Sequence, residues 1–215
     1  MKSILLIGLG HFGKALAMEL NAKGQEIMAV DRQEKRVNDI LPYVTDALIG
    51  DTTSEAFLKS LGINNYDVCV VTIGNDFQSS LETTSLLKEL GAKVVVSYAD
   101  SEVQKKFLLR NGADEVINPA VHIARWASVR FASDHVLDFI TIDKNHAILE
   151  VTVPQAWKGK TVGQLDVRRK HGITLIAVKE GDQTNLVVTP DTLIKGDETL
   201  LVLGDQKSVR KCFGV

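Results

Sequence analysis

The feature that most constrains the fold of this chain is the alternation of short apolar runs with amphipathic stretches over its first 120 residues. Aliphatic and β-branched residues gather in six runs, separated by segments with helical spacing: 3–9, 25–31, 46–50, 67–73, 93–98 and 114–118. Such alternation is typical of a parallel sheet with helices on both faces. The uninterrupted apolar character of 3–9 and 67–73 indicates central strands covered on both sides. We therefore predict an α/β fold with a Rossmann-type doubly wound parallel sheet.

The strand pattern changes after Pro119, which opens a stretch with helical spacing at 119–136. Beyond this stretch, turn signals rather than long helices separate the apolar runs. The runs predict strands at 138–142, 147–153, 173–180, 184–188 and 198–204, and helices at 162–170 and 205–213. We therefore predict two domains: 1–134, which ends in the joining helix, and 135–215, a small β-rich α+β domain.

Composition narrows the classes of protein to which the chain can belong. Its 215 residues are 45% apolar, which is enough for a buried core. The formal charge of -2 lacks the cationic excess of a nucleic-acid binder, so no nucleic-acid partner is expected. No apolar run approaches the roughly 20 residues of a membrane span, and the start runs into a glycine motif rather than a cleavage site. We expect a cytoplasmic protein, and its two cysteines indicate neither a disulfide framework nor a metal site.

A glycine motif, G-x-G-x-x-G, lies between the first predicted strand and the helix that follows, at Gly8, Gly10 and Gly13. The first glycine permits a tight turn, the second lets backbone N–H groups approach a pyrophosphate, and the third allows close helix–strand packing. Asp31 ends the second strand 18 residues beyond Gly13, where a carboxylate accepts hydrogen bonds from ribose hydroxyls. The combination predicts a nucleotide site, and a tight turn without a ligand is the alternative.

Residues at further strand ends extend the predicted site. Arg32 follows Asp31, but the carboxylate repels a 2′-phosphate, so NADP is disfavoured. Small and polar residues also follow the third and fourth strands, on the edge where open α/β sheets bind ligands: Asp51, Thr52, Thr72, Gly74 and Asn75. Asp51 and Asn75 fit helix caps equally well, and both interpretations stand at this point.

No catalytic constellation accompanies the glycine motif. None of the five histidines forms a recognisable pair with an acidic residue, and the motifs HExxH and GxSxG are absent. His11 would lie at the pyrophosphate, so we expect it to contact a phosphate or a neighbouring subunit, or to be solvated, rather than to act as a base. We predict no enzyme, with an NAD-dependent oxidoreductase of unfamiliar type as the alternative.

Motifs along the whole chain resemble those of a known family, the cytosolic regulatory subunits of bacterial Trk and Ktr potassium uptake systems. These subunits are built from regulator of potassium conductance (RCK) domains. The resemblance is carried by IGLGHFGKALAMEL, AVD ending in Asp31, IGDTTSEAFLKSLGI, TIGNDFQSS, LLKELGAKVVVS, NGADEVINP, SDHVLDFI, GKTVGQLDVRRKHGITLIAVKEG and TPDTLIKGDETLLVLG. They occur in the family's order, an N-terminal RCK domain followed by a small C-terminal RCK domain.

The resemblance implies a regulatory subunit that switches conformation on ligand binding, without a covalent step. It would form a homo-oligomer, from a dimer to an octameric ring, beneath a membrane-embedded potassium-translocating subunit of the KtrB or TrkH type. The helix after Pro119 would pack subunits together. The ligand would be an adenine nucleotide, ADP, ATP or NAD(H). The residues assigned to it are Gly8, Gly10, His11, Phe12, Gly13, Asp31, Arg32, Asp51, Thr52, Thr72, Gly74, Asn75 and Tyr98.

Three positions depart from the family pattern. His11 stands where Ktr-type relatives often place an arginine that reaches a terminal phosphate, and Tyr98 stands where a basic residue is common. Ala120 replaces an acidic residue that helps to hold a cation between subunits. These departures remove charge from the region of a γ-phosphate and its metal. We therefore expect no metal site, and we count ADP, AMP and NAD(H) among the candidate ligands.

The C-terminal domain resembles the part that binds cyclic di-AMP at a dimer interface in Gram-positive relatives. Basic side chains would face the phosphates and apolar ones the adenines, and the corresponding residues are Leu165, Arg168, Arg169, His171, Gly172, Ile173, Thr174 and Pro190. Leu165, Ile173 and Pro190 also fit ordinary core and turn positions, and residues 168–170 fit a solvated helix end. A cyclic di-AMP site and an empty dimerisation domain are therefore alternatives.

Overall fold

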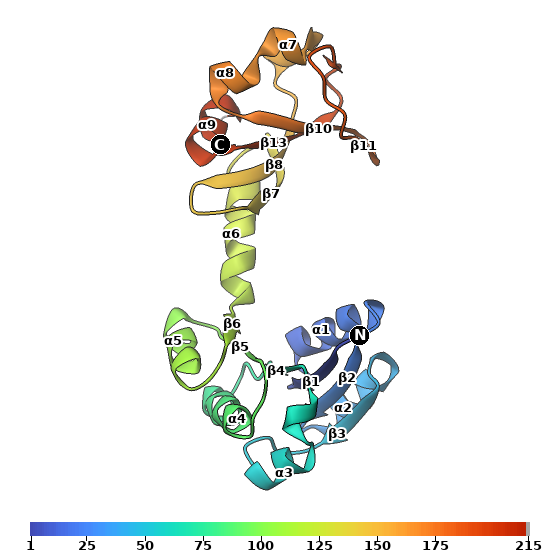
Figure 1. Ribbon diagram of the computed structural model, residues 1–215, viewed down its shortest axis with the longest axis vertical. Coiled ribbons are helices and arrows are strands. Elements are labelled where there is room, and N and C mark those ends of the chain that lie inside the picture. The colour runs from blue at the N-terminus through green and yellow to red at the C-terminus, as the bar shows by residue number, and fades with distance from the viewer. Residues whose placement is uncertain (214–215) are drawn as a thin grey trace. The chain divides into compact units, whose positions relative to one another are not determined.

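The computed structural model describes residues 1–213 of the chain (Figure 1). Contacts within the chain divide it into two units, Met1–Ala120 and a second that begins at Val121. The predicted division at 134 counted the joining helix with the first domain, whereas the contacts group most of that helix with the second unit. The last two residues of the predicted second domain, 214 and 215, lie outside the described residues.

The first unit is built on a six-stranded parallel sheet, as predicted. Its strands are β1 (Ser3–Ile7), β2 (Glu26–Asp31), β3 (Asp46–Ile49), β4 (Val68–Val71), β5 (Val95–Tyr98) and β6 (Glu115–Ile117). They pair in the order β3-β2-β1-β4-β5-β6. The chain therefore changes direction across the sheet between β1 and β4, and a crevice opens beside that pair at the carboxyl edge of such sheets.

Five α-helices cover the two faces of this sheet: α1 (His11–Ala22), α2 (Glu34–Ile40), α3 (Glu55–Ser60), α4 (Phe77–Glu89) and α5 (Glu102–Arg110). Short 3-10 helices follow α2 at Leu41–Tyr43 and α3 at Ile63–Asn65. Neighbouring residues of β1 enter opposite cores, because side chains alternate across a strand. Leu6 packs with α1 and α2, whereas Leu5 packs with α3 and α4, so the continuous apolar run is buried on both sides.

The second unit contains a five-stranded antiparallel sheet in the order β11-β10-β13-β8-β7 and a two-stranded pair of β9 with β12. The strands are β7 (Val136–Thr141), β8 (His146–Thr152), β9 (Lys160–Thr161), β10 (Thr174–Glu180), β11 (Gln183–Asn185), β12 (Leu193–Ile194) and β13 (Thr199–Asp205). Its helices are α6 (Pro119–Phe131), α7 (Val162–Leu165), α8 (Val167–His171) and α9 (Gln206–Phe213), with a 3-10 turn at Gln155–Trp157. The rings of Trp157 and Phe213 meet edge to face in the core, with centroids 5.5 Å apart.

Three predicted elements of the second unit differ from the structure. The helix expected at 119–136 ends at Phe131, and Val136 already belongs to β7. The helix expected at 162–170 breaks into α7 and α8 at Asp166, whose φ is 45°. The break lets Leu165 and Val167 both enter the core, which one continuous helix would prevent because residues two apart lie on opposite faces. The strand expected at 184–188 ends at Asn185, whose side chain accepts a hydrogen bond from the backbone N–H of Val187 at 2.9 Å and turns the chain.

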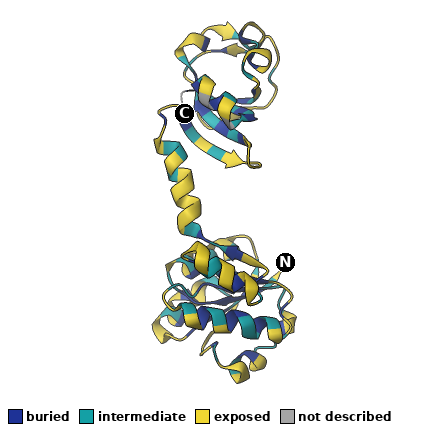
Figure 2. Ribbon diagram, turned by 90° about the vertical axis from the view of Figure 1, so that its left-hand side faces the viewer, coloured by how far each residue is buried: buried dark blue, intermediate teal, exposed yellow. Residues whose placement is uncertain are grey.

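Helix α6 buries none of its 13 residues within the single chain (Figure 2). Its apolar side chains include Ile123, which is 64% exposed, and Phe131, which is 77% exposed. The C-terminal part of α6 is tied to β7, because the indole N–H of Trp126 donates to Asp138 Oδ1 at 2.9 Å. In the described residues, no helix combines the length and apolar character needed to span a bilayer.

Candidate nucleotide-binding site

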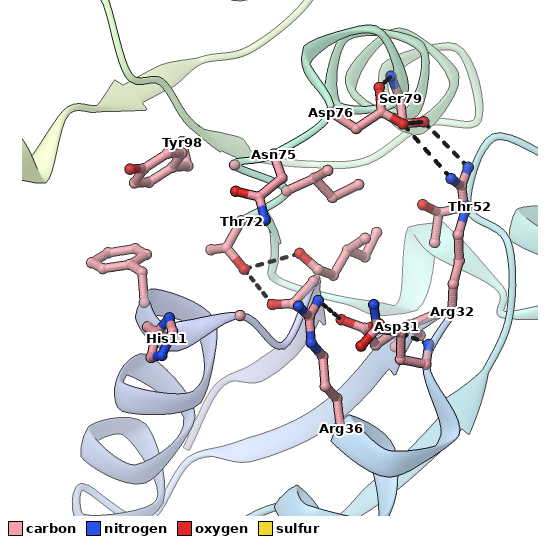
Figure 3. A pocket seen from close by; sticks show the side chains of 18 of the residues that line it. His11, Asp31, Arg32, Arg36, Thr52, Thr72, Asn75, Asp76, Ser79 and Tyr98 are labelled. Atoms are coloured by element: carbon pink, nitrogen blue, oxygen red, sulfur yellow. Dashed lines mark hydrogen bonds and ion pairs between the residues drawn. The ribbon is translucent and has the colours of Figure 1, made fainter.

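A cleft of about 460 Å³ opens at the carboxyl edge of the parallel sheet, within the roughly 300–1,000 Å³ typical of ligand pockets. Residues from the ends of β1 to β5 line it together with the starts of α1, α2 and α4 (Figure 3). All the residues predicted for the nucleotide lie along it except Gly13 and Asp51. The cleft therefore joins motifs that are up to 90 positions apart, from Gly8 to Tyr98.

The glycine loop is held against β4 by close backbone contacts. Gly8 has φ of +92° and a Cβ there would lie 3.0 Å from the carbonyl carbon of Thr72. The hydroxyl of Thr72 donates to the backbone carbonyl oxygens of Ile7, at 3.0 Å, and Gly8 (Figure 3). A Cβ on Gly13 would lie 2.0 Å from the Gly8 carbonyl oxygen, so Gly13 acts through packing below the cleft. At Gly10, in contrast, a Cβ would meet no atom within 4 Å, which leaves room for a ligand.

Helix α1 begins at the floor of the cleft with no side chain capping its N-terminus. Its first hydrogen bond runs from Lys14 N to Gly10 O at 2.9 Å, so the N–H groups of residues 11–13 precede the helical ladder. These donors and the positive end of the helix dipole suit an anionic group. His11 is exposed at the same place and lines the cleft.

Asp31, at the end of β2, is buried and holds the first loops of the site together. Its Oδ2 accepts from Leu9 N at 2.7 Å and from Arg36 Nη1 at 3.4 Å, and its Oδ1 accepts from Gln33 N at 2.8 Å. A carboxylate oxygen accepts about two hydrogen bonds, so Oδ1 has capacity for one more donor. The predicted ribose contact fits this oxygen, although Asp31 also has a structural role that the sequence did not indicate.

Arg32 connects three parts of the cleft rim. Its Nη2 donates to Asp51 Oδ1 at 2.7 Å. Nη2 also donates to Ser79 Oγ at 3.3 Å, and Nη1 lies 3.8 Å from Asp76 Oδ2 (Figure 3). Asp51 also accepts from the hydroxyl and the backbone N–H of Thr53, and these bonds, followed by Arg32, lower the pKa of Asp51 to about 2. Asp51 thus holds Arg32 in place although it does not itself line the cleft.

The alternative interpretation of Asp51 and Asn75 as helix caps is wrong. The cap of α3 is Ser54, which accepts from Phe57 N, and the cap of α4 is Asp76, which accepts from Ser79 N at 3.0 Å. Each true cap lies one to three positions after the residue that the sequence singled out. Asn75 is exposed and lines the cleft.

An aromatic pair lines the part of the cleft that β5 borders. The rings of Phe12 and Tyr98 lie with centroids 5.6 Å apart and planes at 41°. Tyr98 lies against Gly74, where a Cβ would be 3.3 Å from the ring. The Tyr98 phenol donates a hydrogen bond to Asp100 Oδ1, and this bond is the main reason why the pKa of Tyr98 is raised.

Several residues that line the cleft were not predicted from the sequence. They come from the first turns of two helices and the residues just before them: Gln33 and Arg36 at α2, and Asp76 and Ser79 at α4. The capping pattern of Asp76 with Ser79 after a strand end is the signal that could have placed α4 at the rim. Thr52, which was predicted for the nucleotide, lies along the cleft and is buried, and its hydroxyl lies 2.9 Å from that of Thr83 in α4.

The residues predicted for a second nucleotide are divided between the core and the surface of the second unit. Leu165 and Ile173 belong to its core, and Ile173 is 0% exposed. The ring of His171 lies 6.4 Å from that of Trp157, Gly172 caps α8 with φ of 68°, and Pro190 accepts from Gly163 N at 2.8 Å. The other members are exposed: Arg168, Arg169 and Thr174. Among residues 1–213, no group of three or more His, Cys, Asp or Glu side chains is arranged to hold a metal ion.

The fold and the cleft define the class: a nucleotide-binding α/β unit of the Rossmann type followed by a small antiparallel β unit. The family models of the TrkA-N domain and the TrkA-C domain match residues 4–119 and 147–213. The Ktr system potassium uptake proteins C and A of Bacillus subtilis (strain 168) are each 33% identical over 210 residues, which cover 98% of this chain and 95% of each relative. The chain therefore belongs to the TrkA-N domain family, together with these Ktr proteins.

A solved structure, the GsuK channel bound to NAD, has the same fold. It matches 96% of this chain with a TM-score of 0.69 and 16% sequence identity. The match covers 38% of that channel chain, so this protein spans well under half of the length of GsuK. The likeness supports the two-unit architecture described above.

Proposed function

We propose that this chain is a cytoplasmic, nucleotide-responsive regulatory subunit of a potassium uptake system. One observation carries the proposal: the glycine loop, Asp31 and the N-terminus of α1 meet in one cleft, within a chain that is similar over its whole length to Ktr proteins. The subunit would act at the inner face of the membrane through a membrane-embedded potassium-translocating subunit of the KtrB or TrkH type.

The ligand that we propose for the cleft is an adenine nucleotide. Its ribose would bind Asp31 Oδ1, and its phosphates would meet the N–H groups at the start of α1. ADP, ATP and NAD(H) share this adenosine diphosphate part. His11 offers less to a third phosphate than an arginine, because an imidazole has at most two N–H donors whereas a guanidinium has five in a fixed fork.

Regulation would be a shift between conformations, without a chemical step. Arg32 ties the end of β2 to the loop after β3 and to the start of α4. A nucleotide that enters beside Arg32 changes the balance of these contacts, and it favours whichever arrangement it binds more tightly. The alternative, an NAD-dependent oxidoreductase, predicts substrate-dependent turnover of NADH, which a sensor does not show.

The proposed subunit would work as a homo-oligomer, from a dimer to an octameric ring. Helix α6 supports this part of the proposal, because none of its residues is buried in the single chain and its apolar side chains Ile123 and Phe131 are largely exposed. A second copy of the chain would cover such a surface.

Cyclic di-AMP binding by the second unit stays a separate proposal. Arg168, Arg169 and Thr174 are exposed and available to a phosphate at an interface between two copies. The burial of Leu165 and Ile173 favours the alternative of a dimerisation domain without ligand, since neither offers a surface to an adenine in the single chain.

The test is calorimetric titration of the purified full-length protein with ADP, ATP, NADH and cyclic di-AMP. We expect the first three to bind and Asp31→Asn to weaken them at least tenfold, because an amide cannot accept all the hydrogen bonds that this carboxylate accepts. Asp67→Asn is the matched control: Asp67 also accepts from a backbone N–H, that of Ser3, and from a cation, Lys93, but lies outside the cleft. Absence of binding by all four ligands, or equal losses in both variants, would contradict the proposal.

A further inference from the structure

The cleft changes character along its length. On the β2 side, its lining arginines are each paired with carboxylates, Arg32 with Asp51 and Arg36 with Asp31. On the other side of the glycine loop lie His11 and Tyr98 (Figure 3). Arg32 and Arg36 are the only arginines among the lining residues of the described chain, and no lysine lines the cleft. The two guanidinium groups that could bind a third phosphate are thus already paired with carboxylates at the β2 end of the cleft.

The part of the cleft bordered by β5 offers an aromatic surface instead. Phe12 and Tyr98 contact each other in a tilted arrangement with centroids 5.6 Å apart, so a ligand ring would stack on the pair rather than between its members. Gly74 lets Tyr98 lie close to the loop after β4, where a Cβ would already approach the ring to 3.3 Å. Asn75 adds an amide at the same rim.

The sheet topology says which part of a ligand reaches this surface. Strands β2 and β5 lie on opposite sides of the central pair β1 and β4. A ligand with its ribose at Asp31 and its diphosphate at the start of α1 crosses that pair and continues over β4 toward Tyr98. The group beyond the diphosphate therefore faces Phe12, Tyr98 and Asn75.

We propose that the Phe12–Tyr98 pair binds the planar second base of an adenine dinucleotide such as NAD(H), and that the cleft is selective for a dinucleotide over a nucleoside triphosphate. This proposal rests on the proposed function, since it requires that the cleft bind the adenosine diphosphate part. Local charge agrees with it. On this side of the glycine loop, the imidazole of His11 is the one basic side chain among the lining residues of the described chain, so a terminal phosphate would find no arginine or lysine there.

The experiment compares NADH with ADP-ribose, which lacks only the nicotinamide, by calorimetric titration of the full-length wild-type protein. We expect NADH to bind at least tenfold more tightly than ADP-ribose, and ATP no more tightly than ADP. Equal affinities for NADH and ADP-ribose would overturn the dinucleotide proposal while leaving the nucleotide-binding function intact. Failure of ADP, ADP-ribose and NADH to bind would instead contradict the proposed function itself.

Variants locate the preference on the aromatic pair. Phe12→Leu with Tyr98→Leu should reduce the NADH preference to less than about threefold while the affinity for ADP-ribose stays within twofold of wild type, which also shows that the cleft is folded. Tyr98→Phe should retain the preference, since the ring remains. Phe107→Leu, on an exposed aromatic residue of α5 outside the cleft, is the control. A full preference in the double variant would overturn the assignment to Phe12 and Tyr98.

Discussion

The two units of the chain arrange their motif residues in opposite ways. In the first unit, residues from five strand ends and three helix starts line one cleft. In the second, the residues predicted for a ligand are split, with Leu165 and Ile173 in the core and Arg168 and Arg169 on the surface. The difference follows from topology. Parallel strands present all their carboxyl ends at one edge, whereas antiparallel strands divide theirs between two edges.

The comparison also shows what a motif needs to become a site within one chain. The glycine loop is shaped by β4, through Thr72, and by packing of Gly13 on Gly8. In the second unit, the basic residues end helix α8, which has only five residues, and Arg169 lies 3.8 Å from Asp166 in its own turn. The first arrangement encloses space; the second would need another copy of the chain to do so.

The largest effect is expected for Gly13→Val. Its side chain would start 2.0 Å from the Gly8 carbonyl oxygen, and neither backbone can give way. We expect a loss of roughly 4 kcal/mol in the free energy of unfolding of the first unit, with loss of nucleotide binding. Both tryptophans, Trp126 and Trp157, lie in the second unit. The urea unfolding midpoint seen by tryptophan fluorescence should therefore stay near wild type, whereas the midpoint seen by circular dichroism, which also reports the first unit, should fall.

Gly10→Ala is the control for that prediction, because a Cβ at Gly10 meets nothing within 4 Å. It should leave unfolding unchanged within about 1 kcal/mol. Equal destabilisation by Gly10→Ala and Gly13→Val would show that close packing is not what the third glycine provides. A matching shift of the tryptophan signal in Gly13→Val would show that the two units unfold together.

A smaller effect, in the other unit, is expected for Ile173→Ala. Ile173 is fully buried beside Gly204 and Val209, so truncation should lower the unfolding free energy by about 3 kcal/mol. Trp157 packs in the same core, and tryptophan fluorescence should report this loss directly. ADP affinity in the first unit should not change. Thr174→Ala is the control, because Thr174 is the exposed neighbour of Ile173. If it lowered the free energy of unfolding as much as Ile173→Ala, the assignment of Ile173 to the core of the second unit would be contradicted.

Much of the first unit could be predicted from its sequence. The six strands and their parallel arrangement follow from apolar runs whose lengths suit strands, separated by helical spacing. Placing the glycine loop, Asp31 and Thr72 at one edge then needs only the rule that parallel strands share their carboxyl ends. Lining residues that come from helix starts could not be predicted in the same way. Arg36 and Ser79 line the cleft because of where α2 and α4 begin, and the pattern of apolar residues in the strands does not determine those positions.

The second unit was less predictable for a physical reason. Its strands β9 and β12 have two residues each, too few to show an alternating pattern. The break at Asp166 depends on tertiary packing of Leu165 and Val167, which overrides a continuous helical pattern. The same burial separates Leu165 and Ile173 from the exposed basic residues, so spacing alone could not establish whether they share a site.

The smallest expected effect concerns Arg32→Ala at the cleft rim. Arg32 and Asp51 are 47% and 55% exposed, so solvent screening limits the pair to about 0.5 kcal/mol of stability at pH 7. Thr53 and Arg32 lower the folded-state pKa of Asp51 to about 2, from an ordinary value of 3.8. A depressed carboxyl pKa stabilises the fold above the ordinary value, and this contribution is lost as pH falls from about 4 through about 2. The free energy of unfolding of the wild type should exceed that of Arg32→Ala at pH 7, and urea unfolding between pH 7 and pH 2 should show this difference shrinking in that window.

Lys59→Ala is the control, because it removes a surface pair with Glu55 away from the cleft. It should leave ADP affinity unchanged, whereas Arg32→Ala should lower it. A stability difference that stays constant down to pH 2 would show that Arg32 acts on the rim without Asp51.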